Sequence, residues 1–412
     1  MKRLLVYSHD TFGLGNIRRM LCICEYLLKA LPTLSILLVS GSPMVHSFRL
    51  PRRLDYIKLP CLRRTEQGDY AVRVLGTTLD ETVKLRSDLL RATVANFRPH
   101  LLLVDKKPYG VENELQETLR YLNTSLAETR QVLLLRDILD SAEPTMHVWQ
   151  KHAYHEAIRL FYDLILVVGS PEIFDPCETY QFPASVTAKV RFCGYIRRQP
   201  GRTSRDVMRR ELQLRGEKLI LVTPGGGEDG YHLLATYIEG LAWLPEGHNT
   251  HSLMVCGPEM PPAQRTMLSK AAATYPHVRL SEFTNDMMSY IGAADVVVAM
   301  AGYNTVCEVL SLHKQAIVVP RVKPVAEQWI RAERMAQHGL LQTIHPEALT
   351  PQHLMHTVLQ ALHPTSGAHS TPPQVDLNAL PRIAKYISAL LDDEEAASAV
   401  VDVHQRDTTY EA

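Results

Sequence analysis

The chain has 412 residues, of which 46% are hydrophobic, and its 44 basic residues balance 44 acidic ones. This length exceeds what one hydrophobic core usually supports, so two domains are predicted. A formal net charge of zero disfavours a nucleic-acid-binding protein, because such proteins carry a strongly basic surface.

Short leucine-rich and β-branched runs alternate with helical stretches along the first half of the chain. Continuous apolar runs of this kind are typical of parallel strands that are buried on both faces. The predicted strands are 4–8, 35–41, 55–59, 100–105, 131–137, 164–169 and 190–195. They predict a doubly wound α/β domain over residues 1–197.

The first predicted strand ends at His9, and two glycines precede the helix that follows. Glycines before a helix start let a backbone approach a ligand closely, so Gly13, Gly15 and Asn16 are candidate ligand contacts. No third glycine follows, so this is not a dinucleotide-binding fingerprint. His9, with an ordinary pKa of about 6.5, suits a general base; a structural hydrogen bond is the alternative.

Basic residues are frequent over residues 46–73, interleaved with apolar ones. This segment is predicted to contact an anionic membrane surface or an anionic acceptor, with solvated surface charge as the alternative.

Two further carboxylates end predicted strands, Asp105 and Asp137. Both are expected to point at the same cleft as His9, with helix capping as the alternative role. Lys106 and Lys107 have no capping function and are expected to meet an acidic acceptor or a phosphate. No Asp-x-Asp or other cluster of metal ligands is found, so no metal site is predicted.

The strand pattern restarts after the polar stretch 197–205, which is predicted to link two domains. The second set of predicted strands is 219–223, 252–256, 278–283, 295–300, 316–320 and 340–344. The first of them runs into Gly225, Gly226 and Gly227, whose backbone N–H groups suit an anion. We therefore expect a second doubly wound domain over residues 198–363.

The strand at 295–300 runs into Ala301-Gly302 and then a helix start, whose free N–H groups and positive dipole end suit an anion. Glu308 follows in this helix and is predicted to accept both hydroxyls of a ribose. The alternative is a capping box between Thr305 and Glu308.

Residues 364–375 are rich in proline, serine and threonine and predict a linker. An amphipathic helix is predicted over residues 376–391. The segment 392–412 is predicted to be a disordered tail.

Seven cysteines form no Cys-x-x-Cys pair, which is typical of free thiols in a reducing cytoplasm. The N-terminal apolar run is too short for a signal peptide, and no run approaches the roughly 18 apolar residues of a membrane span. A cytoplasmic location is expected, with peripheral contact at the inner membrane face through residues 46–73.

Three runs of sequence, 282–287, 294–308 and 319–328, together resemble the C-terminal domain of glycosyltransferase family 28. The resemblance implies a GT-B architecture: two Rossmann-like domains facing across a cleft, with the last helix crossing back to the N-terminal domain. It also implies contacts to a UDP-sugar: uracil, pyrophosphate, ribose and sugar hydroxyls. The residues carried over are Phe283, Thr284, Gly302, Asn304, Thr305, Glu308, Glu327 and Gln328.

The resemblance implies an inverting, metal-independent bacterial glycosyltransferase that uses a UDP-sugar, UDP-N-acetylglucosamine above all, without a cofactor. Its acceptor is expected to be lipid-linked or a small molecule. The loop before the first helix is similar to the Gly-x-Gly-His-x-x-Arg loop of GT-B transferases, but Asn16 replaces the histidine and cannot take a proton. His9, Asp105 and Asp137 are then the candidate bases. A nucleotide-sugar hydrolase or epimerase, and a non-catalytic nucleotide-sugar-binding protein, remain alternatives.

Overall fold

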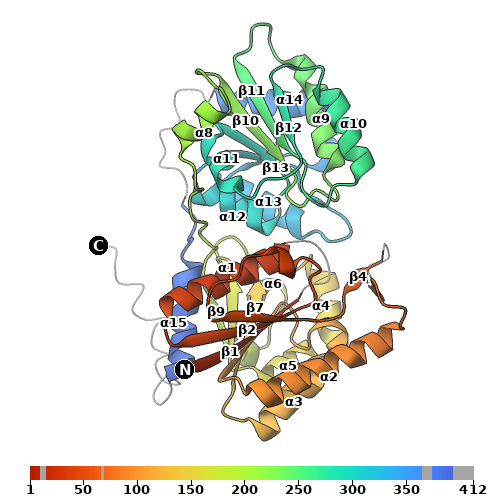
Figure 1. Cartoon of the computed structure of the whole chain (residues 1–412), viewed down its shortest axis with the longest axis vertical. Helices are drawn as coiled ribbons and strands as arrows, with labels where there is room; N and C mark the ends of the chain where they lie inside the picture. Colours follow the sequence, from red (N-terminus) through yellow and green to blue (C-terminus); the bar gives the residue numbers. More distant parts are fainter. Residues whose placement is uncertain (10–14, 66–68, 364–373, 393–412) are drawn as a thin grey trace.

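The computed structural model describes residues 1–9, 15–65, 69–363 and 374–392, and these form two α/β domains stacked along the long axis of the molecule (Figure 1). Gly13, the predicted tail beyond residue 392 and most of the predicted linker 364–375 lie outside the described residues. Within the described part of the chain, no helix has the length and apolar character needed to cross a bilayer.

The N-terminal domain contains a seven-stranded parallel sheet with strand order β3-β2-β1-β6-β7-β8-β9. Its strands are β1 (Lys2–Ser8), β2 (Leu34–Ser40), β3 (Leu54–Lys58), β6 (Leu101–Asp105), β7 (Arg130–Arg136), β8 (Leu164–Val168) and β9 (Val190–Phe192). Its helices are α1 (Gly15–Ala30), α2 (Leu79–Phe97), α3 (Gln116–Ser125), α4 (Ala142–Lys151), α5 (Tyr154–Phe161), α6 (Pro176–Thr179) and α7 (Ala184–Thr187). A two-stranded antiparallel hairpin, β4 (Leu62–Arg64) and β5 (Tyr70–Val72), projects from this domain.

Alternate side chains of each N-terminal strand enter different cores, because successive residues of a strand point to opposite faces. Leu4 and Val6 of β1 pack with α1, whereas Leu5 and Tyr7 pack with α2, α3 and α5. Both faces of the sheet are therefore covered, and ligands can reach it only at its strand ends.

The C-terminal domain contains a six-stranded parallel sheet with strand order β12-β11-β10-β13-β14-β15. Its strands are β10 (Lys218–Thr223), β11 (Thr250–Val255), β12 (Val278–Ser281), β13 (Val296–Ala299), β14 (Gln315–Val318) and β15 (Gln342–Thr343). Its helices are α8 (Arg205–Glu211), α9 (Tyr231–Gly240), α10 (Pro262–Ala272), α11 (Met287–Ala293), α12 (Tyr303–Ser311), α13 (Glu327–Gln337) and α14 (Pro351–Leu362). The order reverses at β10 and β13, and such a reversal is where ligands bind in open α/β sheets.

The last helix, α15 (Ala379–Asp392), lies against α1 of the N-terminal domain (Figure 1). Its apolar stripe, which includes Ile383 and Ile387, is fully buried in the same core as α1. Tyr195 donates its backbone N–H to the carbonyl of Asp376, so the returning segment also bonds to the N-terminal domain next to the interdomain crossing. The chain thus passes between the domains twice.

Candidate functional site

Helix α12 begins at the carboxyl edge of the C-terminal sheet, directly after β13. Gly302 is its N-cap residue and supplies no capping side chain, so the first N–H groups of the helix depend on other partners. Glu308 lies in the second turn and is only 3% exposed. Thr305 is inside the helix, so the alternative of a Thr305–Glu308 capping box is wrong: the helix starts before Thr305.

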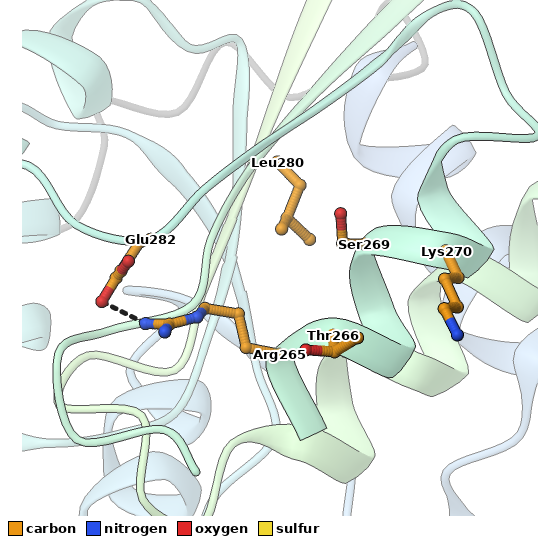
Figure 2. Close-up of a pocket in the computed structure, with 6 residues that line it drawn as sticks. All are labelled: Arg265, Thr266, Ser269, Lys270, Leu280 and Glu282. Atoms are coloured by element: carbon orange, nitrogen blue, oxygen red, sulfur yellow. Dashed lines mark ion pairs between the residues drawn. The ribbon is translucent and has the colours of Figure 1, made fainter. Parts of the chain in front are cut away.

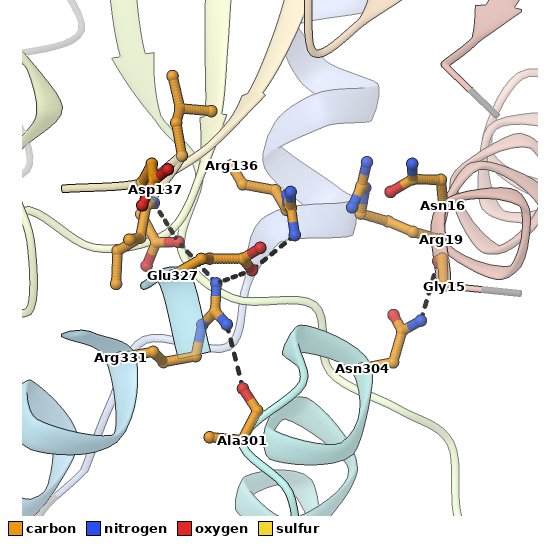
Figure 3. Close-up of polar contacts among 12 residues, drawn as sticks. Gly15, Asn16, Arg19, Arg136, Asp137, Ala301, Asn304, Glu327 and Arg331 are labelled. Atoms are coloured by element: carbon orange, nitrogen blue, oxygen red, sulfur yellow. Dashed lines mark hydrogen bonds and ion pairs between the residues drawn. The ribbon is translucent and has the colours of Figure 1, made fainter. Parts of the chain in front are cut away.

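The N-terminus of α1 meets the N-terminus of α12 across the domain interface. The Asn304 side chain donates to the Gly15 carbonyl at 2.9 Å (Figure 3). Arg18 donates to Glu308 Oε1 at 2.9 Å, and the arginine side chain is 43% exposed whereas the glutamate is 4% exposed. The predicted ribose-binding carboxylate is therefore held by an arginine whose side chain solvent reaches.

The glycine turn after β10 lies beside the same helix start. Gly225 and Gly227 have φ values of +85° and +102°, which side chains other than glycine rarely adopt. A Cβ atom on Gly225 would lie 3.4 Å from Thr305 Oγ1, so the turn and α12 form one backbone surface.

Carboxylates border the other end of this turn. Glu259 Oε2 lies 2.6 Å from where a Cβ atom of Gly226 would be. Burial and neighbouring carboxylates raise the pKa of both Glu228 and Glu259. An anion is therefore favoured at the Gly225 end and disfavoured at the Gly226–Glu228 end.

The segment after β12 carries the residues predicted to contact uracil. The Phe283 side chain is 54% exposed, and Thr284 Oγ1 accepts from the N–H of Asp286 at 3.0 Å. A neighbouring pocket, drawn in Figure 2, has a volume of about 310 Å³ and includes Glu282 but neither Phe283 nor Thr284. The pocket is lined by Arg265, Thr266, Ser269, Lys270, Leu280 and Glu282, and an Arg265–Glu282 ion pair crosses it.

Glu327, predicted to read sugar hydroxyls, lies in a buried network of arginines (Figure 3). Its Oε1 accepts from Arg136 of the N-terminal domain and from Arg331 of α13, each at 2.6 Å. Burial opposes the charged form, but the two guanidinium groups lower the pKa of Glu327 to about 2. Gln328 accepts from the backbone N–H of Arg321 at 3.1 Å. Glu327 is thus a fixed anion at the domain interface.

The two predicted carboxylate bases are engaged in buried contacts. Asp105 is 1% exposed and its Oδ1 lies 2.7 Å from Nη2 of Arg19. Asp137 is fully buried, accepts from the Tyr195 hydroxyl and lies 3.8 Å from Arg331. Both end strands at the domain interface, and each is engaged there by buried partners, so their roles as bases stay predictions.

His9 is 2% exposed, and its Nε2 lies 3.3 Å from the Tyr70 hydroxyl. Burial, Lys106 and Lys107 hold the pKa of His9 well below its ordinary value. The expectation of an ordinary pKa is therefore wrong: the imidazole is neutral at physiological pH but is a weak base. Asn16 donates its side-chain N–H to the His9 carbonyl at 2.7 Å and so fixes the end of β1.

Lys106, whose charge helps to lower the pKa of His9, has a perturbed pKa itself. Burial, Arg136 and Arg64 lower the pKa of Lys106 to about 7. Between pH 7 and the ordinary lysine pKa of about 10.4, Lys106 is protonated to a greater extent in the unfolded chain than in the folded one. The free energy of unfolding therefore rises with pH over this range.

We expect Lys106→Met to raise the melting temperature at neutral pH and to remove this part of the pH slope. Melting curves of wild type and variant across that interval test it, with the exposed Lys84→Met on α2 as the control. An unchanged slope in Lys106→Met would contradict the burial of this charge.

The sequence predicted the carboxylates and glycines of this region but missed the arginines that bind them. Arg18, Arg136 and Arg331 are the partners of Glu308 and Glu327. Among the described residues, no group of three or more His, Cys, Asp or Glu side chains is arranged to hold a metal ion.

Comparison with known proteins shows what this chain is similar to. Residues 219–387 match the glycosyltransferase family 28 C-terminal domain. An uncharacterized glycosyltransferase of Methanopyrus kandleri is 24% identical over 207 residues, which cover 50% of this chain and 56% of that protein. The UDP-N-acetylglucosamine–N-acetylmuramyl-(pentapeptide) pyrophosphoryl-undecaprenol N-acetylglucosamine transferase of Novosphingobium aromaticivorans is 26% identical over 214 residues, which cover 49% and 54%. The chain thus spans about half the length of these curated relatives.

Solved structures extend the likeness over both domains. The crystal structure of MurG from Acinetobacter baumannii has a TM-score of 0.58 at 15% identity, covering 94% of this chain and 99% of that one. The putative UDP-N-acetylglucosamine 2-epimerase from Listeria monocytogenes has a TM-score of 0.64 at 12% identity, covering 96% and 99%. At these identities the likeness concerns the fold alone.

The chain is therefore an α/β protein of the GT-B fold, which confirms the predicted fold class. Residues 219–387 are similar to the glycosyltransferase family 28 C-terminal domain, which confirms the resemblance drawn from the motifs. The assignment of individual site residues stays a prediction.

Proposed function

We propose that this protein is an inverting, metal-independent glycosyltransferase that takes its sugar from a UDP-sugar, UDP-N-acetylglucosamine above all. The observation that carries the proposal is the buried Glu308 on α12, beside Gly302 and the Gly225 turn, at the strand-order reversal of the family 28 domain. The sugar donor printed in the name of the Novosphingobium relative supports the choice of donor.

The chemistry follows from the charges around α12. The ribose hydroxyls of the donor replace Arg18 at Glu308, and the diphosphate lies along the helix start and the Gly225 turn. As the acceptor oxygen attacks the anomeric carbon from the opposite side, the bond to the diphosphate breaks, and the acceptor's hydroxyl proton passes to a base, for which the neutral imidazole of His9 is the candidate. Backbone N–H groups and the released Arg18 then stabilise the charge that develops on UDP.

Nucleotide binding and turnover without acceptor test the proposal together. UDP is expected to raise the melting temperature more than ADP, GDP or TDP, because a ligand that binds only the folded chain stabilises it. UDP-N-acetylglucosamine is expected to remain intact until an acceptor is added. Release of free sugar or of an epimer without acceptor would instead favour the hydrolase or epimerase alternative, and binding without turnover across an acceptor panel would favour a non-catalytic protein.

We also expect UDP binding to persist in excess EDTA, because the helix dipole, the glycine turn and Arg18 supply the positive potential that the diphosphate needs. Calorimetric titration with UDP in EDTA and in magnesium measures this. A loss of UDP binding in EDTA that magnesium or manganese restores would contradict the metal-independent account.

A further inference from the structure

A cluster of cationic side chains surrounds Tyr70, which the hairpin β4–β5 brings to the carboxyl edge of the N-terminal sheet. The Arg64 guanidinium carbon lies 4.9 Å and Lys107 Nζ lies 5.2 Å from the centroid of the Tyr70 ring. Arg64 also donates to the Tyr70 hydroxyl at 3.0 Å. The same hydroxyl lies 3.3 Å from Nε2 of His9 at the end of β1. Residues far apart in sequence thus converge on one ring.

Lys106 adds a further cation to this cluster. It follows β6 and has a φ of +73°, and burial, followed by the charges of Arg136, Arg64 and Lys107, disfavours its charged form. Non-glycine residues held in this backbone region cost free energy and are frequent at functional sites. Lys106 and Lys107 are half-buried, so solvent screens their repulsion incompletely.

The residues that the structure describes give this cluster no counter-charge of its own. In the described part of the chain, Arg64, Lys106 and Lys107 form no ion pair. Glu327 favours the charge on Lys106, but its carboxylate already binds Arg136 and Arg331. Repelling cations that remain partly buried are stabilised when a ligand anion binds between them.

We propose that Arg64, Lys106 and Lys107 bind a phosphate group of the acceptor. This inference rests on the proposed glycosyltransferase function, because it places the acceptor at the N-terminal domain, facing the donor residues across Arg136 and Glu327. A phosphate offers several strong acceptor oxygens and more than one negative charge, which suits three separate cationic donors better than a neutral sugar does. The phosphate belongs either to a lipid carrier or to a soluble sugar phosphate.

The test measures phosphate binding in two arms with UDP present at saturation, so that the donor site is filled. One arm titrates glucose 1-phosphate by calorimetry; the other measures co-sedimentation with phosphatidylcholine vesicles that do or do not contain a polyprenyl phosphate. Wild type is expected to bind in one arm, which identifies the source of the phosphate. Lys106→Gln/Lys107→Gln is expected to bind roughly 10- to 100-fold more weakly, the range for lost hydrogen bonds to a charged group.

Two controls separate this proposal from the donor site and from misfolding. Lys84→Gln, an exposed lysine on α2, is expected to bind as wild type does. Glu308→Gln is expected to weaken UDP binding but not phosphate binding measured without UDP. If the double variant melts below wild type, the exposed Arg64→Gln replaces it. Equal phosphate affinity in wild type and in the cluster variants would overturn the proposal. So would a protein that binds UDP but binds phosphate in neither arm. If the protein does not bind UDP, but phosphate binds to wild type and is lost in the cluster variants, only the donor assignment is refuted.

Discussion

Glu308→Gln is expected to weaken UDP binding by roughly 10- to 100-fold, since a hydrogen bond to a charged group contributes about 1.5–3 kcal/mol. Glutamine keeps the shape of the side chain but loses the negative charge and one of the two carboxylate oxygens that accept the ribose hydroxyls. The buried position of Glu308 on α12 leaves water little chance to substitute for the lost contact. Calorimetry with UDP and with 2′-deoxy-UDP measures the effect: wild type is expected to prefer UDP, and the variant to distinguish the two poorly.

Two further variants sharpen this result. Arg18→Gln removes the guanidinium that occupies Glu308 and is expected to leave binding of the nucleoside uridine, which lacks the diphosphate, unchanged or tighter, because no competing ion pair has to break. Glu239→Gln on α9, an exposed glutamate of the same domain, is the control and is expected to bind as wild type does. A Glu308→Gln protein that melts at a lower temperature yet binds UDP with wild-type affinity would show that Glu308 only holds the domain interface.

Arg331→Met is expected to lower the free energy of unfolding by about 3–5 kcal/mol, the usual consequence of removing one partner of a buried ion pair. Arg331 is fully buried, binds Glu327 at 2.6 Å and the Ala301 carbonyl at 3.1 Å, and lies 3.8 Å from Asp137. Without it, buried carboxylates lose a cation, and burial already raises the pKa of Asp137. Denaturant unfolding of the full chain measures the loss.

The pH dependence of this variant gives an internal check. With the cation gone, the carboxylates of Asp137 and Glu327 bind protons more readily in the folded chain than in the unfolded one, so the variant is expected to recover stability as the pH falls. Arg331→Met combined with Asp137→Asn is expected to be less destabilised than the sum of the single variants, since the two side chains act as one network. Wild-type stability of Arg331→Met would show that the network contributes nothing to the domain interface.

The strands were predictable from sequence because most of them lie within short apolar runs, and every predicted strand has a counterpart in the two parallel sheets. The hairpin β4–β5 was not predicted. Its strands are only three residues long and include Arg63 and Arg64, so no apolar period marks them. Yet this hairpin places the Tyr70 hydroxyl in contact with His9.

The positions of the site carboxylates were predictable, since Asp105, Asp137 and Glu308 stand at strand ends or helix starts. Their partners were not, because Arg18 and Glu308 are 290 positions apart and only the packing of the two domains brings them together. The same packing explains why His9 is a weak base: its burial and the lysines around it depend on tertiary structure, which leaves no local pattern in the sequence.

Amide hydrogen exchange of the full chain with and without UDP tests most directly whether the C-terminal domain binds a nucleotide at α12. The account predicts that saturating UDP slows exchange over residues 302–311 and 224–230, where the helix start and the glycine turn supply N–H groups. It also predicts that Glu308→Gln weakens this protection at the same UDP concentration. Unchanged exchange in both segments, or protection confined to the N-terminal residues 101–110, would contradict it.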